Sequence, residues 1–324
     1  MAMQDRRGFL GAASAIAIGG AFAWPRFGWG EQKNATRASA KSAALPTASL
    51  GPIGRTVPRL GIGCAPLARL KGDDAKPIAI LRRAFDCGVR YIDTAPTYSR
   101  GRSERLIGEA LQGYDRRDFF IATKALDRGG DDARRGVEGS LKRLRVERID
   151  LLQVHAVAKD WKSIFGNDAV LKALETARQE GLIGHLGITG HQNPKYLIEA
   201  IRRYPFATAL VPVNPLDTKY LSFIREFLPF AKERGMAVIA MKVFAGGGLL
   251  ADGRFTAAEC LHYALSQDAV SVAVPGCDAI EHVDEACAAV TGFKLLSAEQ
   301  QAALEARAGE HKGRKSEWYK EADD

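Results

Sequence analysis

The sequence predicts a (β/α)8 barrel, in which eight parallel strands alternate with helices, and three observations support this fold class. Eight short apolar segments with strand character recur along the chain. They start about 30 residues apart, a spacing that suits a repeating strand-plus-helix unit. Segments with helical periodicity fill the intervals between them. The strand candidates begin at positions 59, 91, 119, 149, 185, 208, 237 and 270.

Local sequence features predict the individual strands and helices. Ile149–Leu152 and Ala237–Met241 are apolar enough to be parallel strands that are buried on both faces. A small hairpin is predicted over 51–57, directly before the first strand, Arg59–Gly63. Apolar residues at helical spacing predict helices over 78–87, 133–144, 169–180, 196–203 and 223–234.

An open, doubly wound sheet is the alternative fold. Such a sheet would usually carry a Gly-x-Gly-x-x-Gly turn after its first strand. Here only Gly61-Ile62-Gly63 occurs, and Cys64-Ala65-Pro66 follows it. The barrel is therefore the favoured prediction.

The amino-terminal residues have the pattern of an export signal. Arg6-Arg7 precedes a mild apolar run, Gly11–Ala23, which closes with the A-x-A cleavage pattern Ala21-Phe22-Ala23. The run is too short and too mild to be a permanent membrane span. We expect a signal peptide over 1–23, export of the folded protein by the twin-arginine machinery, and a periplasmic location, with a cytoplasmic location as the alternative.

The rest of the chain divides by composition. A flexible linker rich in Ala, Ser, Lys and Gly is predicted over 24–47, the barrel over 48–312, and a short charged tail over 313–324. The whole chain has 324 residues, 46% of them hydrophobic and 26% charged, which is enough apolar material for a sizeable core. We expect a monomer.

Charge and cysteine content exclude several function classes. The net charge is +8, but the basic residues are scattered through predicted helices without interleaved aromatics, so no nucleic-acid partner is expected. A small anionic ligand such as a phosphorylated cofactor remains compatible with this charge. The five cysteines form no Cys-x-x-Cys pair, so neither zinc nor an iron–sulfur cluster is predicted.

Four side chains suited to proton transfer stand at the ends of predicted strands. Asp93 ends the second strand, and Tyr98 follows in a proline-containing loop before a helix with Ser103 as its predicted N-cap. Lys124 and His155 end the next two strands. Because the carboxyl ends of barrel strands meet at one end of the molecule, these four side chains are expected to converge.

The residue types suit a phenol that acts as an acid. A tyrosine phenol has an ordinary pKa of about 10, so it needs help to donate a proton near neutral pH. A nearby ammonium stabilises the phenolate and lowers that pKa, and a carboxylate holds the ammonium in place. We therefore interpret Asp93, Tyr98, Lys124 and His155 as a catalytic set.

From Leu50 to Lys294 the chain resembles the aldo/keto reductase family. The resemblance rests on Asp-Thr-Ala-x-x-Tyr at 93–98 and on Gly-x-Ser-Glu-x-x-Ile-Gly-Glu-Ala-Leu at 101–111. It implies that Tyr98 is the general acid, Lys124 tunes it, Asp93 pairs with Lys124, and His155 orients the substrate carbonyl. It also implies hydride transfer between NADPH and a small aldehyde or ketone, or the reverse reaction on an alcohol.

The resemblance implies a cofactor site as well, with departures from the family pattern. Thr189 stands where the family has a serine, Gly190 replaces an asparagine, and Met241-Lys242 replaces a Tyr-Ser pair. His282 replaces an arginine at the 2′-phosphate position, so NADP(H) is expected with NAD(H) as an alternative. The other implied cofactor-binding residues are Gly63, Asp93, Phe244, Gly246, Gly247, Pro275, Gly276, Cys277 and Glu285.

Two functions of different class follow. The first is a nicotinamide-dependent carbonyl reductase or alcohol-oxidising enzyme, which the complete set of Asp93, Tyr98, Lys124 and His155 favours. The second is a non-catalytic cofactor-binding or redox-sensing protein on the same barrel, which the altered cofactor residues favour.

Overall fold

The computed structural model describes residues 44–126, 129–159, 164–166, 170–251, 253–309 and 317–320. The predicted signal peptide and most of the predicted linker lie outside these ranges. The last linker residues belong to the fold instead, because Leu45 is buried in the core and Thr47 begins strand β1. The linker boundary at 47 is therefore wrong, and the folded region includes residue 45.

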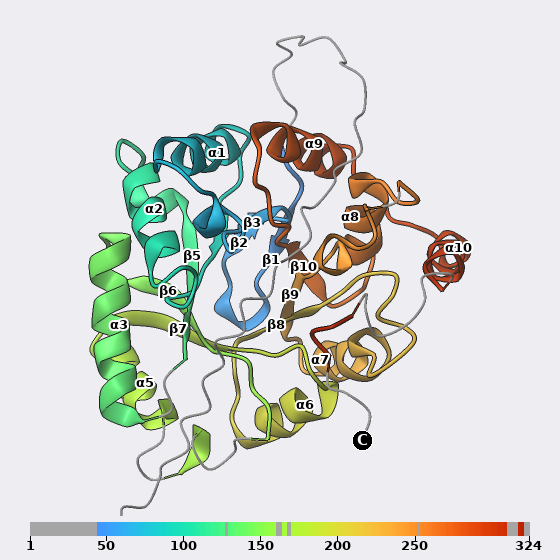
Figure 1. Cartoon of the computed structure of the whole chain (residues 1–324). Helices are drawn as coiled ribbons and strands as arrows, with labels where there is room; N and C mark the ends of the chain where they lie inside the picture. The colour runs from blue at the N-terminus through green and yellow to red at the C-terminus, as the bar shows by residue number, and fades with distance from the viewer. Residues whose placement is uncertain are drawn as a thin grey trace, which may run out of the picture.

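Eight parallel strands form the predicted barrel (Figure 1). Neighbouring strands pair in sequence order from β3 to β10. Isolated bridges from Leu60 to Ala273 and from Gly63 to Gly276 connect the first and last strands at the seam of the barrel. The strands are β3 (Gly61–Gly63), β4 (Tyr91–Asp93), β5 (Phe120–Ala125), β6 (Ile149–Val154), β7 (Ile183–Thr189), β8 (Thr208–Pro212), β9 (Ala237–Met241) and β10 (Val270–Ala273).

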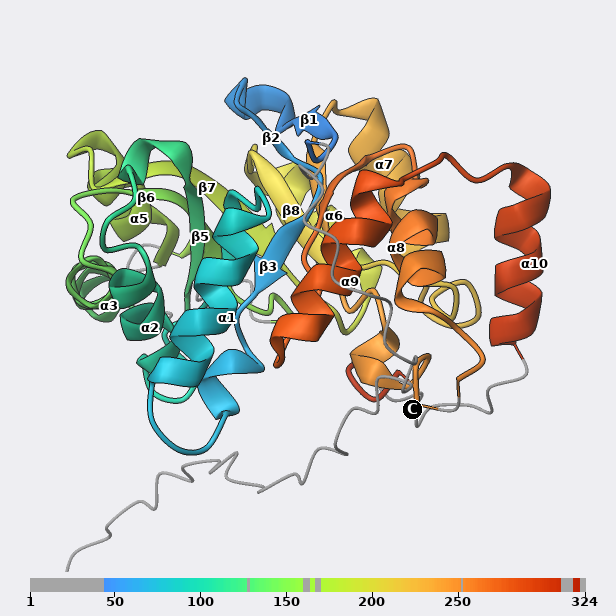
Figure 2. The same cartoon turned by 90° about the horizontal axis from the view of Figure 1, so that it is seen from above.

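Helices surround the strands, and their apolar faces pack on the outside of the sheet (Figures 1 and 2). Helix α10 lies outside this ring. No helix in the described ranges has the length and apolar character needed to cross a membrane. The helices are α1 (Ala75–Asp86), α2 (Arg102–Ala110), α3 (Gly130–Leu144), α5 (Val170–Gln179), α6 (Pro194–Arg203), α7 (Leu228–Glu233), α8 (Ala257–Leu265), α9 (Ile280–Thr291) and α10 (Ala298–Ala308).

The predicted helices are confirmed to within a few residues, except the one over 223–234. That segment forms a short π-helix, Phe223–Phe227, followed by α7. Pro229 lies at the start of α7 and has no amide hydrogen, so it cannot donate the bond that would continue one regular helix through this point.

The predicted hairpin is confirmed and closes the amino-terminal end of the barrel. Strands β1 (Thr47–Ser49) and β2 (Thr56–Pro58) pair in antiparallel register. Leu50 and Val57 from this hairpin join the cluster of side chains that fills the barrel interior. Figure 2 shows the hairpin at one end of the strands, which leaves the carboxyl ends of the strands free to form a site at the other end.

Candidate active site

A cavity of about 280 Å³ opens at the carboxyl ends of the strands, and all four predicted catalytic residues line it. Asp93 comes from β4, Tyr98 from the following loop, Lys124 from β5, and His155 directly follows β6. The parallel register of β4, β5 and β6 brings these strand ends side by side, as the sequence predicts.

The floor of the cavity contains a buried ion pair. The Lys124 ammonium donates to Asp93 Oδ1 at 2.7 Å and to the Thr94 carbonyl at 2.7 Å. Gln153 Nε2 donates to the second carboxylate oxygen, Asp93 Oδ2, at 3.0 Å. The two charged side chains are only 2% and 6% exposed. Burial alone would lower the pKa of Lys124, but Asp93 and Tyr98 raise it above its ordinary value, so the lysine stays charged.

The phenol of Tyr98 lies beside this ion pair. The Lys124 ammonium is 5.1 Å from the centre of the Tyr98 ring. Burial raises the pKa of Tyr98 above its ordinary value, and the charge and hydrogen bond of Lys124 act in the opposite direction. Lys124 therefore lowers the pKa of Tyr98 as predicted, but burial outweighs this effect, and Tyr98 is protonated at neutral pH.

Several residues of the sequence motif support this loop and do not face the cavity. Thr94 Oγ1 donates to Ser103 Oγ at 2.8 Å, and Thr123 Oγ1 donates to the buried Glu104 at 2.7 Å. The predicted N-cap role of Ser103 is wrong, because α2 starts after Gly101 and Ser103 bonds to the strand-end loop instead.

Most of the predicted cofactor residues line the same cavity, and four do not. The cavity lining includes Gly63, Asp93, Thr189, Met241, Lys242, Phe244, Gly246, Gly247, Pro275 and Gly276. Gly190, Cys277, His282 and Glu285 are not part of the lining.

Packing explains why residue 190 is a glycine. A Cβ atom added there would lie 2.2 Å from Leu197 Cδ1, which comes from α6. An asparagine, as in the family pattern, would force the buried Leu197 side chain to shift. Leu197 therefore fills the space that a side chain at position 190 would need, and Gly190 offers a ligand only its backbone.

The segment expected to face a 2′-phosphate contains a hydrogen bond between a histidine and an aspartate. His282 Nδ1 donates to Asp278 Oδ1 at 2.7 Å, and Asp278 lines the cavity. This hydrogen bond lowers the pKa of Asp278, so the carboxylate is ionised at neutral pH. Asp278 therefore lines the cavity, and His282, which was predicted to replace the family arginine, lies behind it.

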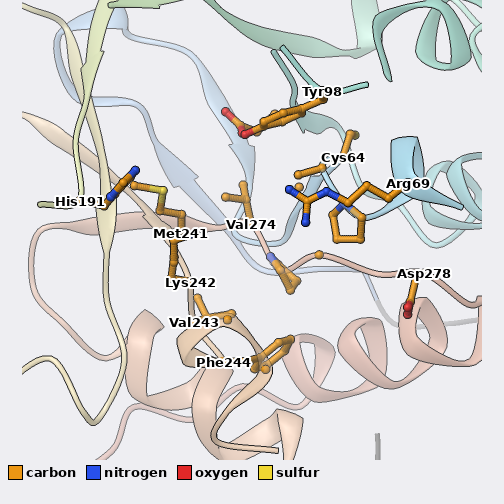
Figure 3. A pocket seen from close by; sticks show the side chains of 18 of the residues that line it. Cys64, Arg69, Tyr98, His191, Met241, Lys242, Val243, Phe244, Val274 and Asp278 are labelled. Atoms are coloured by element: carbon orange, nitrogen blue, oxygen red, sulfur yellow. The ribbon is translucent and has the colours of Figure 1, made fainter. Parts of the chain in front are cut away.

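The close-up shows how predicted and unpredicted residues of the lining lie relative to one another (Figure 3). Tyr98 and Cys64 lie on one wall, Val243 and Phe244 on the opposite wall, and the Arg69 guanidinium points into the space between them. His191 and Asp278 lie at opposite ends. Arg69 ends a short 3-10 helix, Leu67–Arg69, that follows β3, and no periodic pattern in the sequence marks it.

Four described residues of the predicted charged tail, 317–320, pack on the barrel beside the cavity. Lys320 is buried, forming ion pairs with Asp217 at 2.9 Å and Glu317 at 2.7 Å. Tyr319 accepts a hydrogen bond from Asn214 through its hydroxyl, at 3.2 Å, and from His191 through its carbonyl, at 2.8 Å. Residues 317–320, here called the carboxyl-terminal strap, are thus anchored on the barrel.

The strap brings Trp318 to the cavity and places two rings around Lys242. Trp318 is one of the cavity-lining residues. The Lys242 ammonium lies 5.0 Å from the centre of the Trp318 ring and 5.2 Å from that of Tyr319. Burial, with the charges of Arg69 and Lys124, lowers the pKa of Lys242 to about 8.

The chain is similar in sequence and in fold to known oxidoreductases. The chain is 30% identical over 211 residues to an uncharacterised oxidoreductase, YqkF, of Bacillus subtilis, a match that covers 61% of this chain and 64% of that protein. It is 26% identical over 311 residues to L-galactose dehydrogenase of Arabidopsis thaliana, covering 80% and 92%. The holo form of the aldo-keto reductase AKR11C1 from Bacillus halodurans has the same fold, with a TM-score of 0.70, 25% identity, and 81% and 96% coverage.

A family model extends this similarity across most of the barrel. The model described as the aldo/keto reductase family matches residues 59–258, which include β3, the Tyr98 loop and the strand ends that carry Lys124 and His155. The chain therefore belongs to the aldo/keto reductase family.

Proposed function

We propose that this protein is an NADP(H)-dependent oxidoreductase that reduces a small aldehyde or ketone, or oxidises the corresponding alcohol, with Tyr98 as proton donor. The observation that carries the proposal is the contact of a phenol with a buried ammonium–carboxylate pair inside the cavity at the strand ends. NAD(H) is the alternative cofactor, and we propose that the enzyme acts as a monomer.

The cavity suits a phosphorylated nicotinamide in charge and shape. Arg69 and Lys242 supply positive charge to its lining, beyond the lysine that pairs with Asp93. Gly246 and Gly247 have positive φ angles of 68° and 93°, which let the backbone turn closely around a ligand without side chains in the way. When bound, the cofactor supplies or accepts the hydride, and the protein supplies position and a proton.

The protein's part of the reaction follows from five side chains. Tyr98 donates its proton to the carbonyl oxygen as that oxygen gains negative charge, and His155 orients the same oxygen. The Lys124 ammonium stabilises the phenolate that remains on Tyr98. Asp93 and Gln153 hold the ammonium in position. In the oxidation direction the phenolate takes the proton back.

Cofactor choice gives a first test, at Asp278. Replacing Asp278 with asparagine is expected to tighten NADP(H) binding on the order of tenfold and to change NAD(H) binding little, because an ionised carboxylate repels a 2′-phosphate. His282→Arg is expected to act in the same direction, since a guanidinium is permanently charged and binds phosphate through two hydrogen bonds. Dissociation constants for both cofactors are measured by fluorescence titration.

A matched control separates local repulsion from overall charge. Glu285→Gln removes the same charge from the neighbouring helix α9, outside the cavity lining. Its NADP(H) affinity is expected to stay near that of the wild type. Equal tightening in the Asp278 and Glu285 variants would show that the 2′-phosphate does not lie at Asp278.

We also propose that the protein is exported by the twin-arginine machinery and works in the periplasm. Arg6-Arg7, the apolar run and Ala21-Phe22-Ala23 support this proposal. Replacing both arginines with lysine is expected to keep the full-length protein in the cytoplasm. The wild type should appear in the periplasm with Trp24 as its first residue. Fractionation and amino-terminal sequencing measure both. Wild-type protein found uncleaved in the cytoplasm would restore the alternative location.

A further inference from the structure

Four of the five cysteines gather at the seam where the barrel closes. Cys64 directly follows β3, and Cys277 lies in the loop after β10. Cys87 caps the carboxyl end of α1, and Cys287 lies in α9. Helices α1 and α9 follow the two seam strands and pack against one another. All of these cysteines are reduced thiols.

Cys87 and Cys287 face one another across this helix pair. The Cys87 thiol donates to Asp284 Oδ1 at 3.9 Å, and Arg83 Nε donates to the same oxygen at 2.5 Å. Cys287 lies three residues after Asp284 on α9, so the two share a face of the helix. Cys287 therefore lies beside the Cys87 thiol, one turn along α9 from the carboxylate that this thiol contacts.

We propose that Cys87 and Cys287 are a site of disulfide formation that joins α1 to α9 across the seam of the barrel. A disulfide needs two cysteines on neighbouring segments that already lie close together. The packing of α1 on α9 and the contact of Cys87 with Asp284 place Cys87 and Cys287 in that arrangement. The bridge would connect the first helix of the barrel with the last one in its ring, and its loop would enclose most of the chain.

The oxidant is a low-molecular-weight disulfide such as oxidised glutathione. The Cys87 thiolate attacks one sulfur of the oxidant, forming a mixed disulfide and releasing one glutathione thiolate. The Cys287 sulfur then attacks Cys87, which closes the protein disulfide and releases the second glutathione. Each cysteine loses one proton, and the two electrons pass to the oxidant, which becomes two thiols.

The surroundings set the order of attack. Cys87 is half-buried, while Cys287 is only 5% exposed, so an oxidant in solution reaches Cys87 first. Burial raises the pKa of both thiols, but the Cys287 thiol and the Arg83 charge act against this rise at Cys87. Cys64, Cys260 and Cys277 are buried, and burial raises the pKa of each. They are expected to stay reduced.

The test is oxidation of the purified full chain by oxidised glutathione at mildly alkaline pH, followed by alkylation, digestion and mass spectrometry. The expected product is one peptide pair that links Cys87 to Cys287, with two fewer free thiols. The oxidised protein should unfold at a temperature roughly 5–10 °C higher, and a dithiol reductant should reverse the shift.

Matched variants decide the assignment. Cys260→Ser removes a buried thiol away from the seam and should leave the link unchanged. Cys287→Ser, or Cys287→Ala if the serine variant is unstable, should stop at glutathione attached to Cys87. Cys87→Ser should give neither product. A wild type that keeps glutathione on Cys87, or that links Cys64 to Cys277 instead, would overturn the proposal.

Discussion

Replacing Tyr98 with phenylalanine is expected to lower kcat by about 10²–10⁴-fold, the usual contribution of a positioned proton donor. The ring and its contact with Lys124 remain, so the affinity for NADP(H) should change little. Turnover is measured as NADPH consumption with a panel of small aldehydes and ketones, and cofactor affinity by fluorescence titration. A fall in both quantities together would indicate damage to the cavity and not loss of an acid.

Tyr91 provides a matched control from the same part of the chain. It is fully buried in the barrel interior, and its hydroxyl has no hydrogen-bond partner in the described structure. Tyr91→Phe should therefore keep wild-type activity. A Tyr98→Phe enzyme that keeps half its activity would remove Tyr98 as the donor. A wild type that binds the cofactor but reduces no member of the panel would favour the non-catalytic alternative.

Replacing Lys124 with methionine is expected to lower kcat about as much as Tyr98→Phe does. It should also destabilise the fold by about 3–5 kcal/mol, the usual cost of leaving one partner of a buried ion pair alone. Asp93 would keep its hydrogen bond from Gln153 but lose the ammonium. Thermal unfolding should show a midpoint about 10 °C lower. The double variant Asp93→Asn plus Lys124→Met should regain much of the lost stability but should be no more active than Lys124→Met.

The pH dependence of carbonyl reduction follows from the same contact. Reduction needs protonated Tyr98, so activity is present below the pKa of this phenol and is lost as pH rises through it. Burial raises that pKa, and Lys124 lowers it. Residual activity in Lys124→Met should therefore persist to higher pH than activity in the wild type. An alkaline limb that moves to lower pH in this variant would contradict the assigned role of Lys124.

The sequence alone was sufficient for the barrel and for the convergence of the four catalytic candidates. Strand ends are local features, readable from short apolar runs that finish in Asp93, Lys124 or His155. Once the strands are parallel, their carboxyl ends must meet at one end of the molecule. The fold class therefore places these side chains in one cavity without any knowledge of packing.

The sequence did not reveal how distant segments would meet around that cavity. Residues 317–320 read as part of a charged tail, because the partner of Lys320 is Asp217, about 100 residues earlier, and no local pattern connects them. The burial of this pair brings Trp318 to the cavity.

Sequence by itself therefore determined the repeating units, the barrel and the acid–lysine–tyrosine–histidine set at its mouth, because each depends on local periodicity and on strand direction. Tertiary structure alone decided that Leu197 fills the space beside Gly190, that Asp278 pairs with His282, and that the end of α1, which carries Cys87, packs on α9, which carries Cys287. These outcomes depend on which side chains from separate elements come into contact. Such contacts are fixed by close packing and by the need to pair buried charges, and neither leaves a signal in neighbouring residues.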